Sequence, residues 1–162
     1  MADVVDKQTR SRMMSSVRAK NTKFELEVRR RLFAMGFRYR LHQRNLLGTP
    51  DMVLPKYSTV IFTNGCFWHN HGCALSALPH TRHVWWKKKL EKNRLRDGEV
   101  VTKLKELGWR ILIIWECSFR RPRINRSDAL DRVASRAGKF LKSRRSVLEI
   151  PKMSRCRQNR KG

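Results

Sequence analysis

The chain has 162 residues, of which 38 are Lys or Arg and 13 are Asp or Glu, so its formal net charge is +25. A positive charge of this size favours a polyanionic partner such as DNA or RNA. The hydrophobic fraction of 40% is enough for one folded core at this length. The longest apolar run, Ile111–Trp115, is far shorter than the roughly 20 residues that span a bilayer, so we expect no membrane partner.

The positive charge is concentrated at the two ends of the chain. Residues 1–50 carry a net charge of +8, residues 51–119 carry +5 and residues 120–162 carry +12. This distribution is typical of a chemical centre flanked by phosphate-binding arms, although a solvated basic surface would give the same numbers. The N-terminus has no basic start followed by an apolar core, so we expect a cytoplasmic protein with reduced or metal-bound cysteines.

In chain order, residues 1–21 are polar and basic, and we expect a short helix or an arm that becomes ordered on binding. Thr22–Glu25 fits a capping box, and the apolar residues that follow recur at helical spacing as far as Gly36. Alternating apolar and basic residues over 37–41 predict a half-buried strand. A helix followed by a strand is therefore expected at the start of the core.

The middle of the chain predicts two short core strands over 51–54 and 60–62, joined by a hairpin-like connection. Residues 63–83 have no hydrophobic period and are rich in Cys, His and aromatic residues. A loop of that length inside a domain needs a physical reason to be ordered. A long helix over 84–107 and a fully buried strand over 109–115 follow.

The C-terminal part predicts one more helix, with Ser127 as its N-cap and Leu141 near its end. The chain from 144 to 162 is expected to be a disordered basic tail. The order helix, three strands, helix, strand, helix indicates a small mixed α/β layer structure. We therefore expect an arm over 1–21, a core over 22–143 and a tail over 144–162.

The densest chemistry lies in Cys66–Cys73, where two thiols and two imidazoles occur within eight positions. A closed zinc site needs four N or S ligands, and Cys117 at the end of the last predicted strand could supply one. Such a site would pin the 63–83 loop to the sheet and contribute folding free energy. Ordinary buried thiols beside a histidine are the alternative, because the spacing is not a standard CxxC pair. The candidate ligands are Cys66, His71, Cys73 and Cys117.

Asp51 opens an apolar strand, where a carboxylate is costly unless it is hydrogen-bonded or bound to a metal. It could hold Mg²⁺ against a scissile phosphate, with the main-chain carbonyl of Thr63 as a second ligand. The imidazole of His69, if it is not needed for zinc, could be the general base for an attacking water. The simpler alternative is that Asp51 is only a turn residue after a proline.

Other polar residues have plain interpretations. The sequence favours Glu25 as the partner in the capping box and no more. Asp97 could be an exposed residue of the long helix, among basic neighbours. The remaining histidines show no constellation and are expected to be surface or phosphate-contacting groups: His42, His80 and His83.

Several aromatic residues lie beside the Cys/His cluster and a basic run that includes Lys87 and Lys88. Flat side chains next to phosphate-binding charges can stack on bases or insert between them, although core packing is the alternative. Phe67 and Trp68 are adjacent, so regular structure cannot point both into one core. We expect at least one of them to contact nucleic acid.

Three segments resemble the Vsr family of very-short-patch repair endonucleases: Pro50–Asp51, Ile61–His69 and Gly108–Cys117. The opening Met1–Val4 and Thr9–Ser11 are also similar, so the resemblance covers roughly residues 1–120. It implies a restriction-endonuclease-like α/β fold, a mixed sheet flanked by helices, with a zinc-braced loop. It also implies a Mg²⁺-dependent nick in double-stranded DNA on the 5′ side of the thymine in a T:G mismatch.

The resemblance further implies roles at individual positions. Asp51 matches a metal-binding aspartate, Thr63 the main-chain ligand and His69 the general base. Glu25 and Asp97 match acids that support metal-bound waters or orient catalytic groups. The implied zinc ligands are Cys66, His71, Cys73 and Cys117. The implied DNA contacts are an aromatic wedge of Phe67, Trp68 and Trp86 beside the mismatch, and an embracing N-terminal arm around Met14.

Position 64 is Asn, where well-known members of that family carry a catalytic His. An amide can donate a hydrogen bond to a phosphate oxygen but cannot transfer a proton at neutral pH. The reaction could therefore be slower, or Mg²⁺-bound water could protonate the leaving oxygen. Two alternatives stay open: a protein that binds mismatched DNA without cutting it, and a related restriction nuclease for a specific sequence. We expect a monomer in the bacterial cytoplasm, associated with the nucleoid, that could cooperate with mismatch-repair proteins.

Overall fold

The computed structural model describes residues 8–9, 22–120 and 124–151. Our predictions for Met14 and for most of the arm lie outside these residues. Within them, a five-stranded mixed sheet packs against helices α2, α3 and α4, which confirms the predicted fold class. No helix in the described ranges combines the length and the apolar character needed to cross a membrane.

The five strands lie side by side in the order in which they occur in the chain. The first three are antiparallel neighbours, whereas β3–β4 and β4–β5 are parallel. Parallel neighbours need a crossover, which α3 supplies for the first pair and α4 for the second. The strands are β1 (Arg40–Leu41), β2 (Met52–Leu54), β3 (Thr59–Asn64), β4 (Arg110–Trp115) and β5 (Val147–Ile150).

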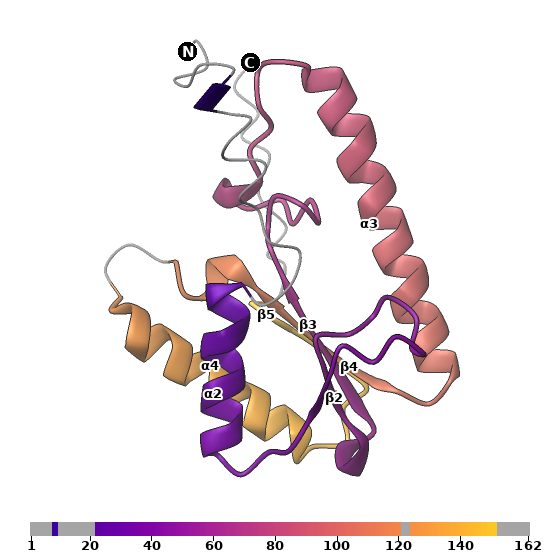
Figure 1. Cartoon of the computed structure of the whole chain (residues 1–162), viewed down its shortest axis with the longest axis vertical. Coiled ribbons are helices and arrows are strands. Elements are labelled where there is room, and N and C mark those ends of the chain that lie inside the picture. The colour runs from indigo at the N-terminus through magenta and orange to yellow at the C-terminus, as the bar shows by residue number, and fades with distance from the viewer. Residues whose placement is uncertain (1–7, 10–21, 121–123, 152–162) are drawn as a thin grey trace.

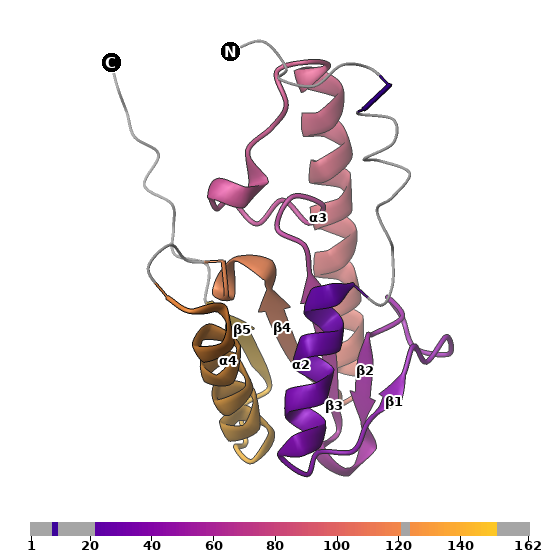
Figure 2. The same cartoon turned by 60° about the vertical axis from the view of Figure 1, so that its left-hand side comes forward.

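Helices cover both faces of the sheet (Figure 1, Figure 2). Helices α2 (Lys23–Ala34) and α4 (Arg126–Leu141) lie on one face, and α3 (His83–Glu106) lies on the other. Side chains of β4 alternate between the two cores: Leu112 and Ile114 pack toward α2 and α4, and Ile111 packs toward α3. Burial on both faces explains why this strand has no polar alternation.

The caps of two helices differ from the predictions. The Thr22 hydroxyl accepts a hydrogen bond from the backbone N–H of Glu25 at 3.2 Å, as a capping box requires. The Glu25 carboxylate, however, pairs with Arg29 one turn later, so its predicted role as the reciprocal capping partner is wrong. The N-cap of α4 is Asn125, whose side-chain oxygen accepts from the N–H of Ser127, so the predicted cap lay two residues too late.

The described chain beyond residue 143 is not a tail. Residues 147–150 form β5, which pairs with β4 from Ile111–Val147 to Ile114–Ile150. Ile150 is fully buried in the core beside α2 and α4. The basic residues that precede this strand concealed its short apolar pattern, and the predicted boundary of the core at 143 is therefore wrong. The predicted strand over 37–41 is also shorter, since only Arg40–Leu41 pairs with β2.

Arg110, the first residue of β4, binds the segment that leads from the end of α4 to β5. Its guanidinium donates to the carbonyls of Phe140 and Leu141, at 2.5 and 3.1 Å, at the C-terminal end of α4. It also donates to the carbonyls of Arg145 at 2.9 Å and Tyr57 at 3.3 Å. Helix C-termini carry partial negative charge, so a cation is favourable there. One side chain thus joins four backbone segments.

We predict that Ile150→Ala destabilises the protein by about 2–5 kcal/mol, because it leaves a cavity beneath the sheet. The control is Leu95→Ala, whose side chain is 66% exposed on α3 and should cost no more than about 0.5 kcal/mol. Urea unfolding followed by circular dichroism measures both. Equal midpoints for the two variants would mean that β5 contributes nothing to the core.

Candidate active site and metal cluster

Asp51 is held at the start of β2 by the end of β3. Its carboxylate oxygen Oδ2 accepts hydrogen bonds from the backbone N–H and the hydroxyl of Thr63, both at 2.7 Å. Its backbone N–H donates to the carbonyl of Ile61 at 3.1 Å. These bonds orient the half-buried carboxylate and satisfy one of its oxygens. Asp51 is therefore more than a turn residue.

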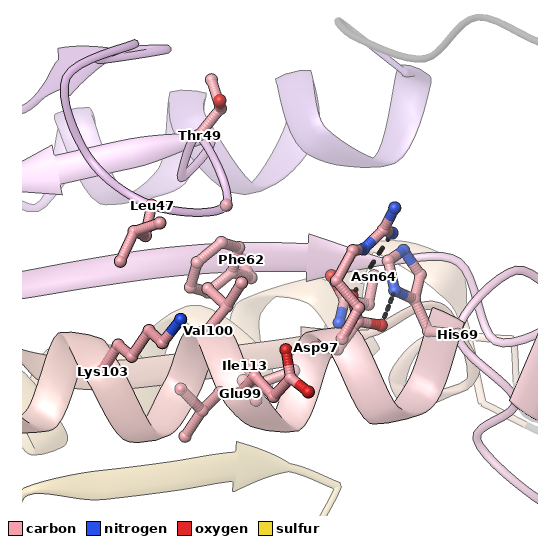
Figure 3. Close-up of a pocket in the computed structure, with 13 residues that line it drawn as sticks. Leu47, Thr49, Phe62, Asn64, His69, Asp97, Glu99, Val100, Lys103 and Ile113 are labelled. Atoms are coloured by element: carbon pink, nitrogen blue, oxygen red, sulfur yellow. Dashed lines mark hydrogen bonds and ion pairs between the residues drawn. The ribbon is translucent and has the colours of Figure 1, made fainter. Parts of the chain in front are cut away.

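His69 and Asp97 form a hydrogen-bonded pair. The Nδ1 atom of His69 lies 2.6 Å from the Oδ2 atom of Asp97, which projects from α3 (Figure 3). The two side chains are 27% and 29% exposed, so the simpler interpretation of Asp97 as an exposed helix residue is wrong. A carboxylate at Nδ1 fixes the proton there and leaves Nε2 as the basic nitrogen of a neutral imidazole.

A cavity of about 540 Å³ lies between the turn before β2, strand β3 and helix α3. Asn64, His69 and Asp97 line it together, as the close-up in Figure 3 shows. Gly48 brings the turn close to α3: its φ is +72°, and a Cβ atom there would lie 2.5 Å from a methyl of Val100. A side chain at this position would push the turn away from α3.

A second cleft, of about 760 Å³, opens next to His69. Thr63, His69 and Trp68 line it together with Glu116. His69 lines this cleft directly, and the lining residue Thr63 also holds the Asp51 carboxylate. Glu116 pairs with Arg120 at 3.1 Å and is an acidic lining residue that the sequence analysis did not single out.

Glu25, His42 and Asp51 form a second cluster of polar side chains, linked to the lining residue Thr63 through Asp51. One ligand atom of each residue lies within 4.8 Å of the other two, a spacing at which they could hold a metal ion. His42 was predicted to be a surface or phosphate-contacting group; its side chain is only 19% exposed, so the surface position is wrong. The register of the antiparallel strands explains its position. Leu41 pairs with Met52, so His42, which follows Leu41, lies opposite Asp51, which precedes Met52.

The predicted Cys/His cluster is assembled in the structure. Ligand atoms of its four residues all lie within 4.8 Å of one another. The backbone N–H of Cys117 donates to the sulfur of Cys66 at 3.3 Å, and the sulfur of Cys117 is 3.5 Å from Nδ1 of His71. The buried Nε2 of His71 has no hydrogen-bond partner among the described residues. The four residues are Cys66, His71, Cys73 and Cys117.

Protonation of this cluster is set mainly by burial. Burial raises the pKa of the Cys66 thiol well above its usual range, and it raises the pKa of Cys117 to about 11. Burial acts in the same direction on Cys73, but hydrogen bonds from the Leu75 N–H and the Ser76 hydroxyl lower its pKa overall. Burial lowers the pKa of His71, which favours the neutral imidazole that binds metals.

The three aromatic residues of the predicted wedge form one cluster. Ring centroids are 5.1 Å apart for Phe67 and Trp68, 5.2 Å for Phe67 and Trp86, and 6.1 Å for the two indoles, all edge to face. Trp85 extends this cluster, with its centroid 4.8 Å from that of Trp86 and 52% of its surface exposed. The predicted phosphate contacts Lys87 and Lys88 are exposed on the same helix.

The sequence of the chain is similar to those of known proteins. A model described as DNA mismatch endonuclease Vsr matches residues 2–75. The DNA mismatch endonuclease Vsr of Escherichia coli strain K12 is 45% identical over 120 residues, which cover 74% of this chain and 77% of that protein. The chain belongs to the Vsr family. The resemblance found in the sequence is thereby confirmed.

Two type II nicking enzymes are also similar to this Vsr-family chain. V.XorIIP of Xanthomonas oryzae pv. oryzae is 44% identical over 117 residues, covering 72% of this chain and 86% of that protein. V.NmeAIP of Neisseria meningitidis serogroup A is 39% identical over 131 residues, which cover 78% of this chain and 94% of that protein. The segment that the Vsr model matches includes Asp51, Cys66 and His69 but not Asp97 or Cys117. The fold brings Asp97 to His69 and Cys117 to Cys66.

We predict that the purified Vsr-family protein carries one tightly bound transition-metal ion per chain, and that Cys73→Ser abolishes it. Because burial raises the pKa of Cys66 and Cys117, their thiols are protonated at neutral pH without metal. Metal binding therefore releases protons, and the affinity falls as the pH is lowered. Elemental analysis counts the ion. The control His80→Gln lies outside the cluster and should keep it; retention of metal by the Cys73 variant would contradict the ligand set.

Proposed function

We propose that this chain is a DNA repair endonuclease that nicks one strand of double-stranded DNA on the 5′ side of the thymine in a T:G mismatch. The observation that carries the proposal is that one cleft is lined both by Thr63, which holds Asp51, and by His69, which pairs with Asp97. This arrangement supplies a carboxylate for a divalent ion and a base for water. The relatives named as mismatch endonuclease and nicking enzymes support DNA as the substrate.

Asp51 and the main-chain carbonyl of Thr63 are the residues that we assign to Mg²⁺. The donor set fits, since Mg²⁺ prefers carboxylate and carbonyl oxygens, and Thr63 already occupies Oδ2 of Asp51, which leaves Oδ1 for the ion. When bound, the ion stabilises negative charge that develops on the scissile phosphate. The bonds from Thr63 hold the carboxylate in one orientation for that purpose.

His69 takes the proton of the attacking water at Nε2. Its Nδ1 is held by Asp97, which stabilises the imidazolium that forms. Asn64 lines the cavity next to this pair and is 9% exposed, so its amide can donate a hydrogen bond to a phosphate oxygen. An amide cannot transfer a proton at neutral pH, and the leaving oxygen therefore takes its proton from water.

The Cys/His cluster is assigned to structural zinc. Three thiols and one imidazole match the closed tetrahedral sites that zinc prefers, and their position joins the loop after β3 to the end of β4. The cluster thus stabilises the loop that carries His69. Zinc in this role supplies folding free energy rather than chemistry.

The DNA-binding surface that we propose combines charge and aromatic area. Phe67, Trp68 and Trp86 would insert beside the mismatch, and Lys87 and Lys88 would bind neighbouring phosphates. The net charge of +25 supports a strongly salt-dependent interaction. We further propose an arm around Met14 that embraces the other groove, and a monomer in the bacterial cytoplasm and nucleoid that cooperates with mismatch-repair proteins.

We predict that the wild-type protein nicks a labelled duplex with a single T:G pair when Mg²⁺ is present, and that Asp51→Asn lowers the rate by at least about 10³-fold. Gel electrophoresis of both labelled strands measures the product. A matched T:A duplex is the substrate control. Equal cutting of the matched duplex would favour a sequence-specific nicking enzyme, and tight mismatch binding without any product would favour a non-catalytic protein.

We predict that Asp97→Asn lowers the single-turnover nicking rate by about 10²–10⁴-fold, because the amide no longer holds the proton on Nδ1 of His69. Binding to mismatched DNA, measured by fluorescence anisotropy, should change far less. Glu106→Gln, an exposed change near the end of the same helix, is the control. A rate like that of the control would mean that the His69–Asp97 pair takes no part in the reaction.

A further inference from the structure

A buried arginine lies inside the acidic cluster next to Asp51. Arg29 follows Glu25 by one turn of α2, and the two side chains are only 6% and 3% exposed. Its Nη2 atom donates to Oε1 of Glu25 and lies 2.9 Å from Nε2 of His42. One guanidinium nitrogen therefore contacts two of the three groups that face one another there.

The position of this nitrogen is one that a metal ion could take. Glu25, His42 and Asp51 present ligand atoms within 4.8 Å of one another. Two carboxylates and an imidazole at that spacing could bind a divalent transition ion such as Mn²⁺. The Glu25 oxygen and the His42 nitrogen lie 3.6 Å apart, and the Arg29 nitrogen contacts both. A cation of the protein thus lies where an ion between these two residues would lie.

The charge balance of the cluster supports the same interpretation. A guanidinium only donates hydrogen bonds, so the 2.9 Å contact with Arg29 is a hydrogen bond when Nε2 of His42 is the acceptor. Two carboxylates and one guanidinium then leave one net negative charge. A single divalent ion on the Asp51 side converts this to one net positive charge, which matches a phosphodiester. A second divalent ion beside the guanidinium would be repelled.

We propose that Arg29 is a resident cation that takes the place of a second divalent ion, so that the site binds one ion, at Asp51. The inference rests on the proposed function in that it concerns the metal of that same site. Two-metal nucleases hold two ions about 3.5–4 Å apart to stabilise attacking and leaving oxygens. Here Arg29 is a positioning residue: it fixes Glu25 and His42 and keeps positive charge beside the scissile phosphate.

The test counts Mn²⁺ ions bound by zinc-loaded protein, using the electron paramagnetic resonance signal of unbound Mn²⁺. Arg29→Met keeps an unbranched apolar stem but removes the guanidinium, which leaves the three ligands open to solvent ions. We expect Arg29→Met to bind one Mn²⁺ more per chain than the wild type. Folded Arg29→Met protein that binds the same number of ions, or fewer, would overturn the proposal.

Two controls define the extra ion. Arg30→Met changes the exposed neighbour on the same helix and should bind as many ions as the wild type. The double variant Arg29→Met/His42→Gln should lose the additional ion, because the imidazole ligand is gone. An additional ion that survives in the double variant would be bound elsewhere and would count against the assignment.

A second variant keeps the test decisive if Arg29→Met does not fold. In His42→Gln the amide oxygen can still accept from Arg29, so the Mn²⁺ affinity should stay within about twofold of wild type. A loss of roughly tenfold or more would make His42 a metal ligand and overturn the proposal. The number of bound ions is compared between each variant and the wild type. Wild-type protein without any bound Mn²⁺ would contradict the proposed metal site at Asp51. An additional Mn²⁺ in Arg29→Met would still support Arg29 as the resident cation.

Discussion

The parallel pairing of β3 with β4 determines where the chemistry of this protein lies. Asn64 pairs with Trp115, so both strands release the chain at the same edge of the sheet. Two residues later Cys66 and Cys117 meet, and the N–H of one donates to the sulfur of the other. In open α/β sheets, sites form beyond the carboxyl ends of the strands for this reason. Both the thiol cluster and the loop that carries His69 depend on that pairing.

Helix α3 provides the second support of this loop. It extends beyond the sheet alongside residues 65–82 (Figure 1). From it Asn93 donates to the carbonyl of Trp68 at 3.1 Å, and Asp97 binds His69. The loop is therefore held by thiols on one side and by a helix on the other. A loop with little more regular structure than the 3-10 helix Ala74–Ser76 can in this way hold an imidazole in a fixed orientation.

The sequence predicted the elements and clusters that depend on a local pattern of residues. It did not predict the contacts that depend on which strands pair and in what register. Apolar runs predicted β2, β3, β4 and the extent of α3, and the spacing of thiols and imidazoles predicted the Cys/His cluster. His42 and Arg29 could not be predicted as neighbours of Asp51, because only the register of β1 and the depth of α2 bring them there. Strand β5 was missed because its pairing with β4 outweighs the surrounding charge.

The two groups of polar residues around Asp51 are attached to opposite layers. Glu25 belongs to α2, which salt bridges of 2.6 and 2.7 Å join to α4 and its N-terminus on one face. Asp97 belongs to α3 on the other face, and only the sheet lies between them. The thickness of that three-layer stack thus sets the spacing between Glu25 and Asp97. A larger side chain in either apolar layer would act as a spacer and move the two carboxylates apart without touching either of them.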